Sequence, residues 1–225
     1  MTGMGMRYER YDDAEVTEFR VVAAPDELVP ALQRSAFTER DGCWVRSCPA
    51  GTPHVDDAWV NFQRLAEPWL RQLAGLEPVL WEETLDLVCR RLEGIDWWLT
   101  GSAALAARGM AITPGDLDLV VSGADSHRAG ELLLDGLVEP VAAVDWFCDW
   151  FGRAMFGARV EWAGGVGPAA DQPEITDFGP HAAARLDKVR WRDHDIRVPP
   201  LDLQRAVNVR RGLTERVRLI DQFAD

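Results

Sequence analysis

Two aspartates, Asp116 and Asp118, lie within the apolar run DLDLVV at residues 116–121. Successive side chains of a β-strand point to opposite faces, so both carboxylates share the face opposite Leu117 and Leu119. Placing charge in an apolar strand is costly without a partner. Neighbouring carboxylates favour a hard cation, and Mg²⁺ shared with substrate phosphates suits such oxygen ligands. The spacing therefore predicts a site for a metal and a nucleotide.

A glycine and a serine precede this strand. Gly101 and Ser102 follow the apolar run at residues 97–99 and open an alanine-rich helical segment. The first N–H groups and the dipole of a helix favour phosphate, and glycine lets the backbone approach a ligand closely. We expect strand, turn, helix and metal-binding strand over residues 96–122. Separately, each feature has a plainer explanation, a helix N-cap or a solvated strand.

Gly101-Ser102, thirteen intervening residues and Asp116-Leu117-Asp118-Leu119 together resemble the signature of the nucleotidyltransferase superfamily typified by DNA polymerase beta, in its minimal and antibiotic-modifying branches. Thr100 stands where that family usually has an apolar residue, and the interval is at the long end. The resemblance covers residues 80–165. It implies an α/β (α+β) fold with a polymerase-beta-like mixed sheet flanked by helices, an added N-terminal region and a C-terminal helix. It also implies an NTP co-substrate and Mg²⁺, with two ions.

A third carboxylate is expected on a neighbouring strand. Residues 151–166 are predicted to form a pair of strands that turns near Gly157. In the family named above, a carboxylate on the strand beside the Asp-x-Asp strand completes the metal site, and Glu161 matches that position by its order and context. A two-metal site needs carboxylates from more than one strand, and a base must accept the proton of the attacking hydroxyl. Asp145 is the competing residue, and Glu161 on a solvated strand is the other alternative.

The C-terminal segment VPPLDLQRAVNVRRGLTERVRLI is predicted to be helical from residue 201, with a break at Gly212. It resembles the C-terminal helical segment of bacterial minimal and antibiotic nucleotidyltransferases, in which a basic residue contacts the nucleotide phosphates. Arg210 and Arg211 are the nearest equivalents, although a lysine is more usual there. The alternative is a solvated basic helix face. Strands are expected at residues 183–191 and 196–198.

The chain is divided into three parts by its sequence pattern. Residues 1–78 form an N-terminal region of mixed helix and strand with no assigned role, residues 79–180 form the catalytic core, and residues 181–225 pack on that core. The N-terminal region is predicted to contain strands at residues 15–22 and 43–47, a helix at residues 25–36, and two consecutive helices from residue 57 that are separated at Pro68. Further helices are expected at residues 80–94 and 126–136.

Composition limits the classes of function. The net charge of −13 disfavours a protein whose main task is to grip a nucleic-acid backbone. Residues 181–220 contain ten Lys or Arg against five Asp or Glu, a net of +5 that leaves −18 on the rest of the chain. The four cysteines form no CxxC pair, which excludes a typical zinc site, although Cys43 and Cys48 could form a reducible pair. No apolar stretch approaches the roughly 18 residues of a membrane span, so we expect a cytoplasmic protein without a membrane partner.

Together these features predict an Mg²⁺-dependent nucleotidyltransferase that transfers an NMP from an NTP to a hydroxyl group of a small molecule, such as an aminoglycoside-like antibiotic, and releases pyrophosphate. Asp116, Asp118 and Glu161 are its predicted catalytic residues and metal ligands. The predicted contacts with the nucleotide phosphates are Gly101, Ser102, Arg210 and Arg211. Two alternatives stay open: a toxin-type transferase that modifies tRNA through its basic C-terminal segment, and a non-catalytic nucleotide-binding or partner-binding module of the same fold.

Overall fold

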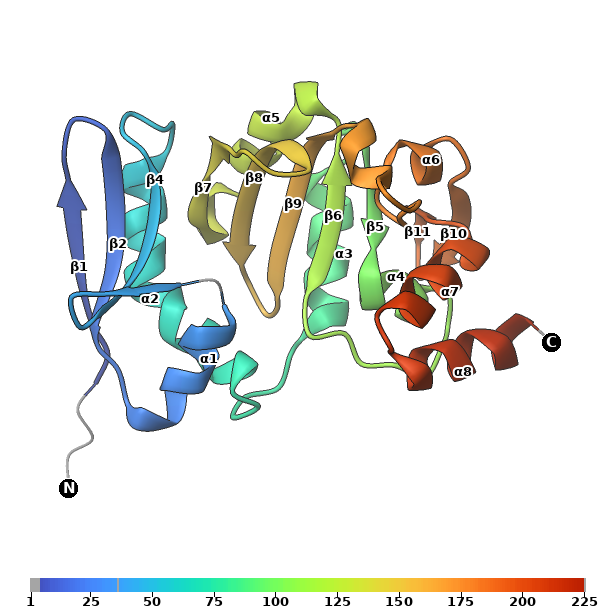
Figure 1. Cartoon of the computed structure of the whole chain (residues 1–225), viewed down its shortest axis with the longest axis horizontal. Coiled ribbons are helices and arrows are strands. Elements are labelled where there is room, and N and C mark those ends of the chain that lie inside the picture. The colour runs from blue at the N-terminus through green and yellow to red at the C-terminus, as the bar shows by residue number, and fades with distance from the viewer. Residues whose placement is uncertain (1–4, 36, 225) are drawn as a thin grey trace.

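The computed structural model describes residues 5–35 and 37–224 and shows a mixed α/β protein. An N-terminal sheet lies at one end, a five-stranded sheet lies in the middle, and a small hairpin with several helices lies at the C-terminal end (Figure 1). The predicted class, a mixed sheet flanked by helices with an N-terminal addition and C-terminal helices, is confirmed.

The N-terminal sheet has four antiparallel strands in the order β1-β2-β4-β3. They are β1 (Arg7–Asp12), β2 (Val16–Ala23), β3 (Thr38–Arg40) and β4 (Cys43–Pro49). The predicted strands at residues 15–22 and 43–47 correspond to β2 and β4. The predicted helix appears as a short 3-10 turn followed by α1 (Val29–Arg34), and its expected end at residue 36 lies outside the described residues.

Helix α2 (Val55–Leu73) is one continuous helix, so the predicted interruption at Pro68 is wrong. A proline inside a helix removes one hydrogen bond and costs about 3 kcal/mol. The side chains of Phe62, Trp69 and Leu70 are nearly or fully buried on both sides of Pro68, and burying a large apolar side chain contributes about 1.5–3 kcal/mol. Packing across the break outweighs the local preference.

The central sheet has the strand order β5-β6-β9-β8-β7. Its members are β5 (Trp97–Thr100), β6 (Leu117–Val121), β7 (Leu137–Ala143), β8 (Cys148–Met155) and β9 (Arg159–Val166). β6 and β9 run parallel, and the other neighbours run antiparallel. The predicted strand pair at residues 151–166 is confirmed as the β8–β9 hairpin. The helices of this region are α3 (Trp81–Arg91), α4 (Gly101–Ala107) and α5 (Ser126–Leu132), the last of which ends before the predicted residue 136.

The C-terminal part contains α6 (Pro180–Ala183), the hairpin β10 (Asp187–Trp191) and β11 (His194–Val198), and two helices, α7 (Leu201–Arg210) and α8 (Thr214–Ala224). The predicted break at Gly212 is confirmed, and its φ of +68° is a conformation that suits glycine. The strand predicted from residue 183 starts only at Asp187, because Pro180 begins a short helix there.

One buried apolar cluster extends from Phe19 in the N-terminal sheet to Val198 in the C-terminal hairpin. In the central sheet, Gly152 of β8 lies opposite Trp162 of β9. A Cβ atom on Gly152 would overlap the buried indole ring of Trp162. The glycine therefore makes room for the largest side chain on this strand.

We expect Gly152→Ala to lower the free energy of unfolding by about 1–3 kcal/mol, because overpacking forces the indole out of its site. Urea unfolding followed by circular dichroism measures this loss. Gly167→Ala is the matched control, since a Cβ atom there meets open space, and we expect a change within about 0.5 kcal/mol. Equal stabilities for the two variants would contradict this account of the packing.

Two further findings concern the sequence predictions. Cys43, Cys48, Cys89 and Cys148 are all free thiols, so Cys43 and Cys48 are not paired. Within residues 5–35 and 37–224, no helix combines the length and the apolar character needed to cross a membrane.

Candidate active site

The strand register brings Asp118 and Glu161 side by side. β6 and β9 are parallel neighbours in which Asp118 is the partner of Glu161, and on its other side Asp118 is the partner of Thr100 in β5. Strands in a sheet lie about 4.8 Å apart, and residues in register point to the same face. Asp116 precedes the first residue of β6 by one position and is half-buried. The three predicted acidic residues therefore lie near the N-terminal ends of the two parallel strands β6 and β9.

Gly101 forms the turn between β5 and α4 with a φ of +64°. A Cβ atom at this position would lie 2.6 Å from Oδ2 of Asp118, so only glycine leaves room for that carboxylate. The carbonyl oxygen of Gly101 accepts a hydrogen bond of 3.2 Å from Nε2 of the buried Gln204 in α7. Ser102 follows in the first turn of α4 and is buried. The turn is thus held against Asp118 by the C-terminal helix.

Two arginines bind the other two carboxylates. Arg159 of β9 is paired with Asp116, and its Nε lies 3.3 Å from Oε1 of Glu161. Arg153 of β8, which is only 4% exposed, donates a hydrogen bond of 2.6 Å from Nε to the same Oε1 atom. Among the described residues, Asp118 has no hydrogen bond or ion pair from a side chain. Asp118 is therefore the one carboxylate of the three that faces the site without a bound cationic group.

The ion pairs continue away from the site into the N-terminal sheet. Arg153 is also paired with Glu139 of β7, and Glu139 is paired in turn with Arg46 of β4. The guanidinium of Arg153 lies 5.1 Å from the ring centre of Trp69 in α2. Arg153 is buried and Glu139 and Arg46 are half-buried, and each of the three has a partner of opposite sign, as charges removed from water require. Charges of alternating sign thus connect the N-terminal region with the acidic site.

These contacts shift the pKa values of Asp118 and Glu161 in opposite directions. Burial, followed by the nearby carboxylates of Asp116 and Glu161, raises the pKa of Asp118 to about 7. Burial would also raise the pKa of Glu161, but the guanidinium groups of Arg153 and Arg159 outweigh it and hold that pKa below its ordinary value. Glu161 is therefore ionised at neutral pH, whereas the guanidinium of Arg159 offsets only part of the rise in the pKa of Asp118.

The chemistry of the three carboxylates fits a hard divalent cation, because Mg²⁺ prefers oxygen ligands and few carboxylates per ion. Asp118 is half-buried and, among the described residues, forms no ion pair, so a bound cation would offset its charge most directly. In the part of the chain that the structure describes, however, no three His, Cys, Asp or Glu side chains are gathered as the ligands of one ion. Asp116 and Glu161 are oriented towards Arg159 and Arg153 instead.

A cavity of about 390 Å³ opens beside Asp118 and Glu161. One part of its wall is polar and consists of Thr100, Gly101, Asp118, Glu161, Asp177 and Arg211. The rest is apolar and contains four aromatic side chains, Trp146, Phe147, Phe151 and Phe178. The cavity wall thus combines acidic and aromatic side chains; we call the part beside Asp118 and Glu161 its acidic end and the part beside the aromatic side chains its apolar end.

The two arginines predicted to contact phosphate have different surroundings. Arg211 lines the cavity. Arg210 points to the loop before α6, where its Nε lies 2.6 Å from Oε2 of Glu174. Asp145, the competitor of Glu161 for the third carboxylate, lies exposed in the loop between β7 and β8. Asp118 has Glu161, not Asp145, as its neighbour in the sheet.

Sequence reasoning missed several residues of this site. Asp177 lines the cavity together with the carboxylates of Asp118 and Glu161; it is 6% exposed, and burial raises its pKa. It lies in an irregular segment, where no helical or strand periodicity in the sequence indicates which side chains face the site. Arg159 stands two residues before Glu161 and so shares its strand face, a spacing that could have identified it. Arg153 shares that face through its register with Glu161, which only the hairpin pairing reveals.

No protein-family model matches the sequence, and no curated protein matches it. Among solved structures, the chain is similar to a candidate nucleotidyltransferase from Thermotoga maritima, with 16% sequence identity and a TM-score of 0.49 over 64% of this chain and 92% of the other. It is also similar to ANT(2″)-Ia, solved in complex with adenylyl-2″-tobramycin, with 12% identity and a TM-score of 0.42 over 64% of this chain and 88% of the other. At these values the similarity concerns the arrangement of the chain and does not identify its activity.

Proposed function

We propose that the protein is an Mg²⁺-dependent nucleotidyltransferase that moves a nucleoside monophosphate from an NTP to a hydroxyl group of a small molecule. The observation that carries this proposal is the register of Asp118 with Glu161 on parallel strands, directly against the glycine turn at Gly101. Acidic ligands for a cation and a backbone turn open to phosphate are the two requirements for handling a nucleoside triphosphate.

The carboxylates, the glycine turn and Arg211 would have different roles in binding the nucleotide. Asp116, Asp118 and Glu161 would hold Mg²⁺ jointly with the phosphates, and the ion would neutralise the negative charge on them. Gly101 and Ser102 would bind the β- and γ-phosphates through the backbone at the start of α4. Arg211 supports the same end of the nucleotide by its position on the cavity wall. Asp118 or Glu161 would accept the proton of the attacking hydroxyl.

The charge of the C-terminal segment favours a small acceptor over tRNA. Docking of tRNA requires basic side chains that are available to phosphates. Most of the arginines in residues 181–220 are instead paired with carboxylates of the same chain. These are Arg185, Arg190, Arg192, Arg197, Arg205, Arg210 and Arg218. An acidic protein with local charge compensation suits a cationic, hydroxylated acceptor of the aminoglycoside type.

The division of the chain also remains a proposal. Residues 1–78 would contribute to the acceptor side, residues 79–180 would form the catalytic core, and residues 181–225 would support it. The ion pair between Arg46 and Glu139 supports the view that the N-terminal region packs against the catalytic core and contributes to the same site.

The experiment is incubation of the protein with each of the four NTPs labelled at the α-phosphate, Mg²⁺, and either a panel of aminoglycosides or bulk tRNA. Label in a small molecule supports the proposal, and omission of Mg²⁺ should abolish it. Label in tRNA would show that the acceptor is RNA and not a small molecule. Failure of every acceptor, together with absence of Mg²⁺-dependent NTP binding, would overturn the proposal.

We expect Gly101→Ala to reduce transfer by at least about 100-fold, because the new Cβ atom displaces the carboxylate of Asp118 and small misplacements are costly in catalysis. Gly42→Ala is the matched control. Gly42 has a φ of +75° and a Cβ atom there meets open space, so it shares the backbone strain without the clash. In parallel melting and transfer assays we expect both variants to lose stability, G101A by more because of the clash, and only G101A to lose activity. Full activity of G101A would contradict the assignment of this turn.

A further inference from the structure

Three aromatic residues form a continuous group at the apolar end of the cavity. We call Trp146, Phe147 and Phe178 the aromatic cluster. The ring centres of Trp146 and Phe147 are 4.0 Å apart, and those of Phe147 and Phe178 are 4.8 Å apart. Trp146 is 69% exposed although tryptophan carries one of the largest apolar surfaces of any residue. Packing in the apolar core therefore does not account for the position of Trp146.

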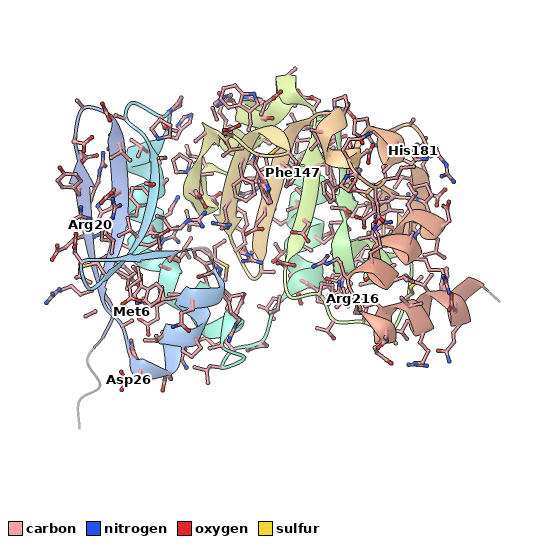
Figure 2. The ribbon with its side chains drawn as sticks, in the orientation of Figure 1. Met6, Arg20, Asp26, Phe147, His181 and Arg216 are labelled. Carbon is pink, nitrogen blue, oxygen red and sulfur yellow. The ribbon has the colours of Figure 1, made fainter. Side chains whose placement is uncertain are left out.

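The cluster lies beside the acidic end of the same cavity. From Asp118 to Val120 along β6, and from Glu161 to Ala163 along β9, the wall advances by two residues, or about 7 Å. Val120 and Ala163 lie in register and share the face that carries the carboxylates. Figure 2 shows Phe147 over the central sheet. A ligand of nucleoside length can therefore contact both ends of the cavity.

Hydrogen bonds hold the two segments that carry the cluster. The carbonyl oxygen of Phe147 accepts a bond of 3.4 Å from the N–H of Gly167. The carboxylate of Asp171 accepts bonds of 2.9 Å from the N–H groups of Thr176 and His181, which fixes the turn around Phe178. A preformed site costs less to order when a ligand binds.

We propose that the aromatic cluster stacks on the base of the donor nucleotide. This inference rests on the proposed function, in which Asp118 and Glu161 would help to hold the Mg²⁺ ion that binds the phosphates. A nucleotide has an anionic end and a planar aromatic end, and the cavity offers Arg211 with the Mg²⁺ ligands for the first and the cluster for the second. A cationic acceptor without an aromatic ring is matched by the carboxylates instead. Stacking tolerates every base, so the cluster predicts modest discrimination among the four NTPs.

The test compares wild-type protein with Trp146→Ala and Phe147→Ala by calorimetric titration without any acceptor. The probes are the Mg²⁺ complexes of ATP, CTP and inorganic tripolyphosphate, the last of which has no ring. We expect each substitution to raise the Kd of both nucleotides by about 10-fold and to leave that of tripolyphosphate within about 2-fold. Phe223→Ala is the matched control, because Phe223 is exposed on α8 and does not line the cavity; its Kd values should equal those of the wild type.

The outcomes separate this inference from the function on which it rests. Wild-type binding of the nucleotides with unchanged Kd values in both variants overturns the stacking and leaves the function intact. An equal loss of tripolyphosphate binding also overturns it, since the effect is then not on the base. A wild type that binds no Mg²⁺-nucleotide complex overturns the function and the inference together.

Discussion

Asp118→Asn abolishes nucleotidyl transfer and at the same time stabilises the metal-free protein at and above pH 7; this is the result that we expect from the position of Asp118. The neutral amide keeps the size of the side chain but loses the charge that binds a cation. The half-buried wild-type carboxylate lies beside Asp116 and Glu161, and the guanidinium of Arg159 offsets only part of their effect on its pKa. Residues placed for function in this way reduce stability, and their replacement relieves the strain.

The pH dependence of this stabilisation follows from the pKa of Asp118. Burial and the neighbouring carboxylates raise it from 3.8 to about 7 in the folded protein. A group with a raised pKa contributes stability that is fully present below its unfolded pKa and is lost as the pH rises through its folded pKa. The metal-free wild type should therefore lose stability between about pH 4 and pH 7, and D118N should not show this loss.

Melting curves in EDTA from pH 4 to pH 8 and transfer assays with Mg²⁺ measure both effects. We expect D118N to melt several degrees above the wild type at pH 8 and to approach it at pH 4. Asp145→Asn is the matched control, because Asp145 is exposed in the loop before β8, and it should leave both the transfer rate and the melting curve unchanged. A D118N protein with full transfer activity would refute the assignment of Asp118, and a loss of activity in D145N would favour the competing carboxylate.

The second large effect concerns stability. We expect Arg153→Met to lower the free energy of unfolding by about 1.5–3 kcal/mol, because the half-buried carboxylates of Glu139 and Glu161 lose the cation that they share and keep only one guanidinium each. Arg153→Lys should recover only part of this loss, since an ammonium group lacks the planar fork that contacts two carboxylates at once. Urea unfolding at pH 7 measures the series.

Two further variants make this prediction specific. Arg190→Met removes an exposed arginine that is paired with Asp195, and a surface ion pair of this kind contributes about 1 kcal/mol at most. Adding Glu139→Gln to Arg153→Met removes one of the two carboxylates that Arg153 no longer compensates and should restore part of the stability. An R153M protein no less stable than R190M would show that Arg153 does not hold these carboxylates together.

The sequence was informative where a short local pattern determines the outcome. The alternation of Asp116 and Asp118 with buried leucines located the acidic strand, and the turn near Gly157 located the hairpin that carries Glu161. The positive φ of Gly101 agrees with the expected close approach of the backbone. These features depend on periods of two residues and on the special conformations of glycine, which the sequence records directly.

The rest depends on contacts between distant residues. Arg46 and Glu139 are 93 positions apart, and the residues next to either of them in the sequence do not indicate that the two form an ion pair. Helix α2 passes through Pro68 because Phe62 and Trp69 are buried by distant elements, which overrides the local preference. Asp177 and Phe178 reach the cavity from an irregular segment whose path is fixed by Asp171. Local patterns cannot supply such long-range packing.

The most direct test of the central claim compares ATP labelled at the α-phosphate with ATP labelled at the γ-phosphate, each incubated with Mg²⁺ and the acceptor panel. A nucleotidyltransferase site predicts α-label in the acceptor and γ-label in pyrophosphate, with both products absent in D118N. Transfer of the γ-label to the acceptor, or equal transfer by wild type and D118N, would contradict the proposal that Asp116, Asp118 and Glu161 form a nucleotidyl-transfer site.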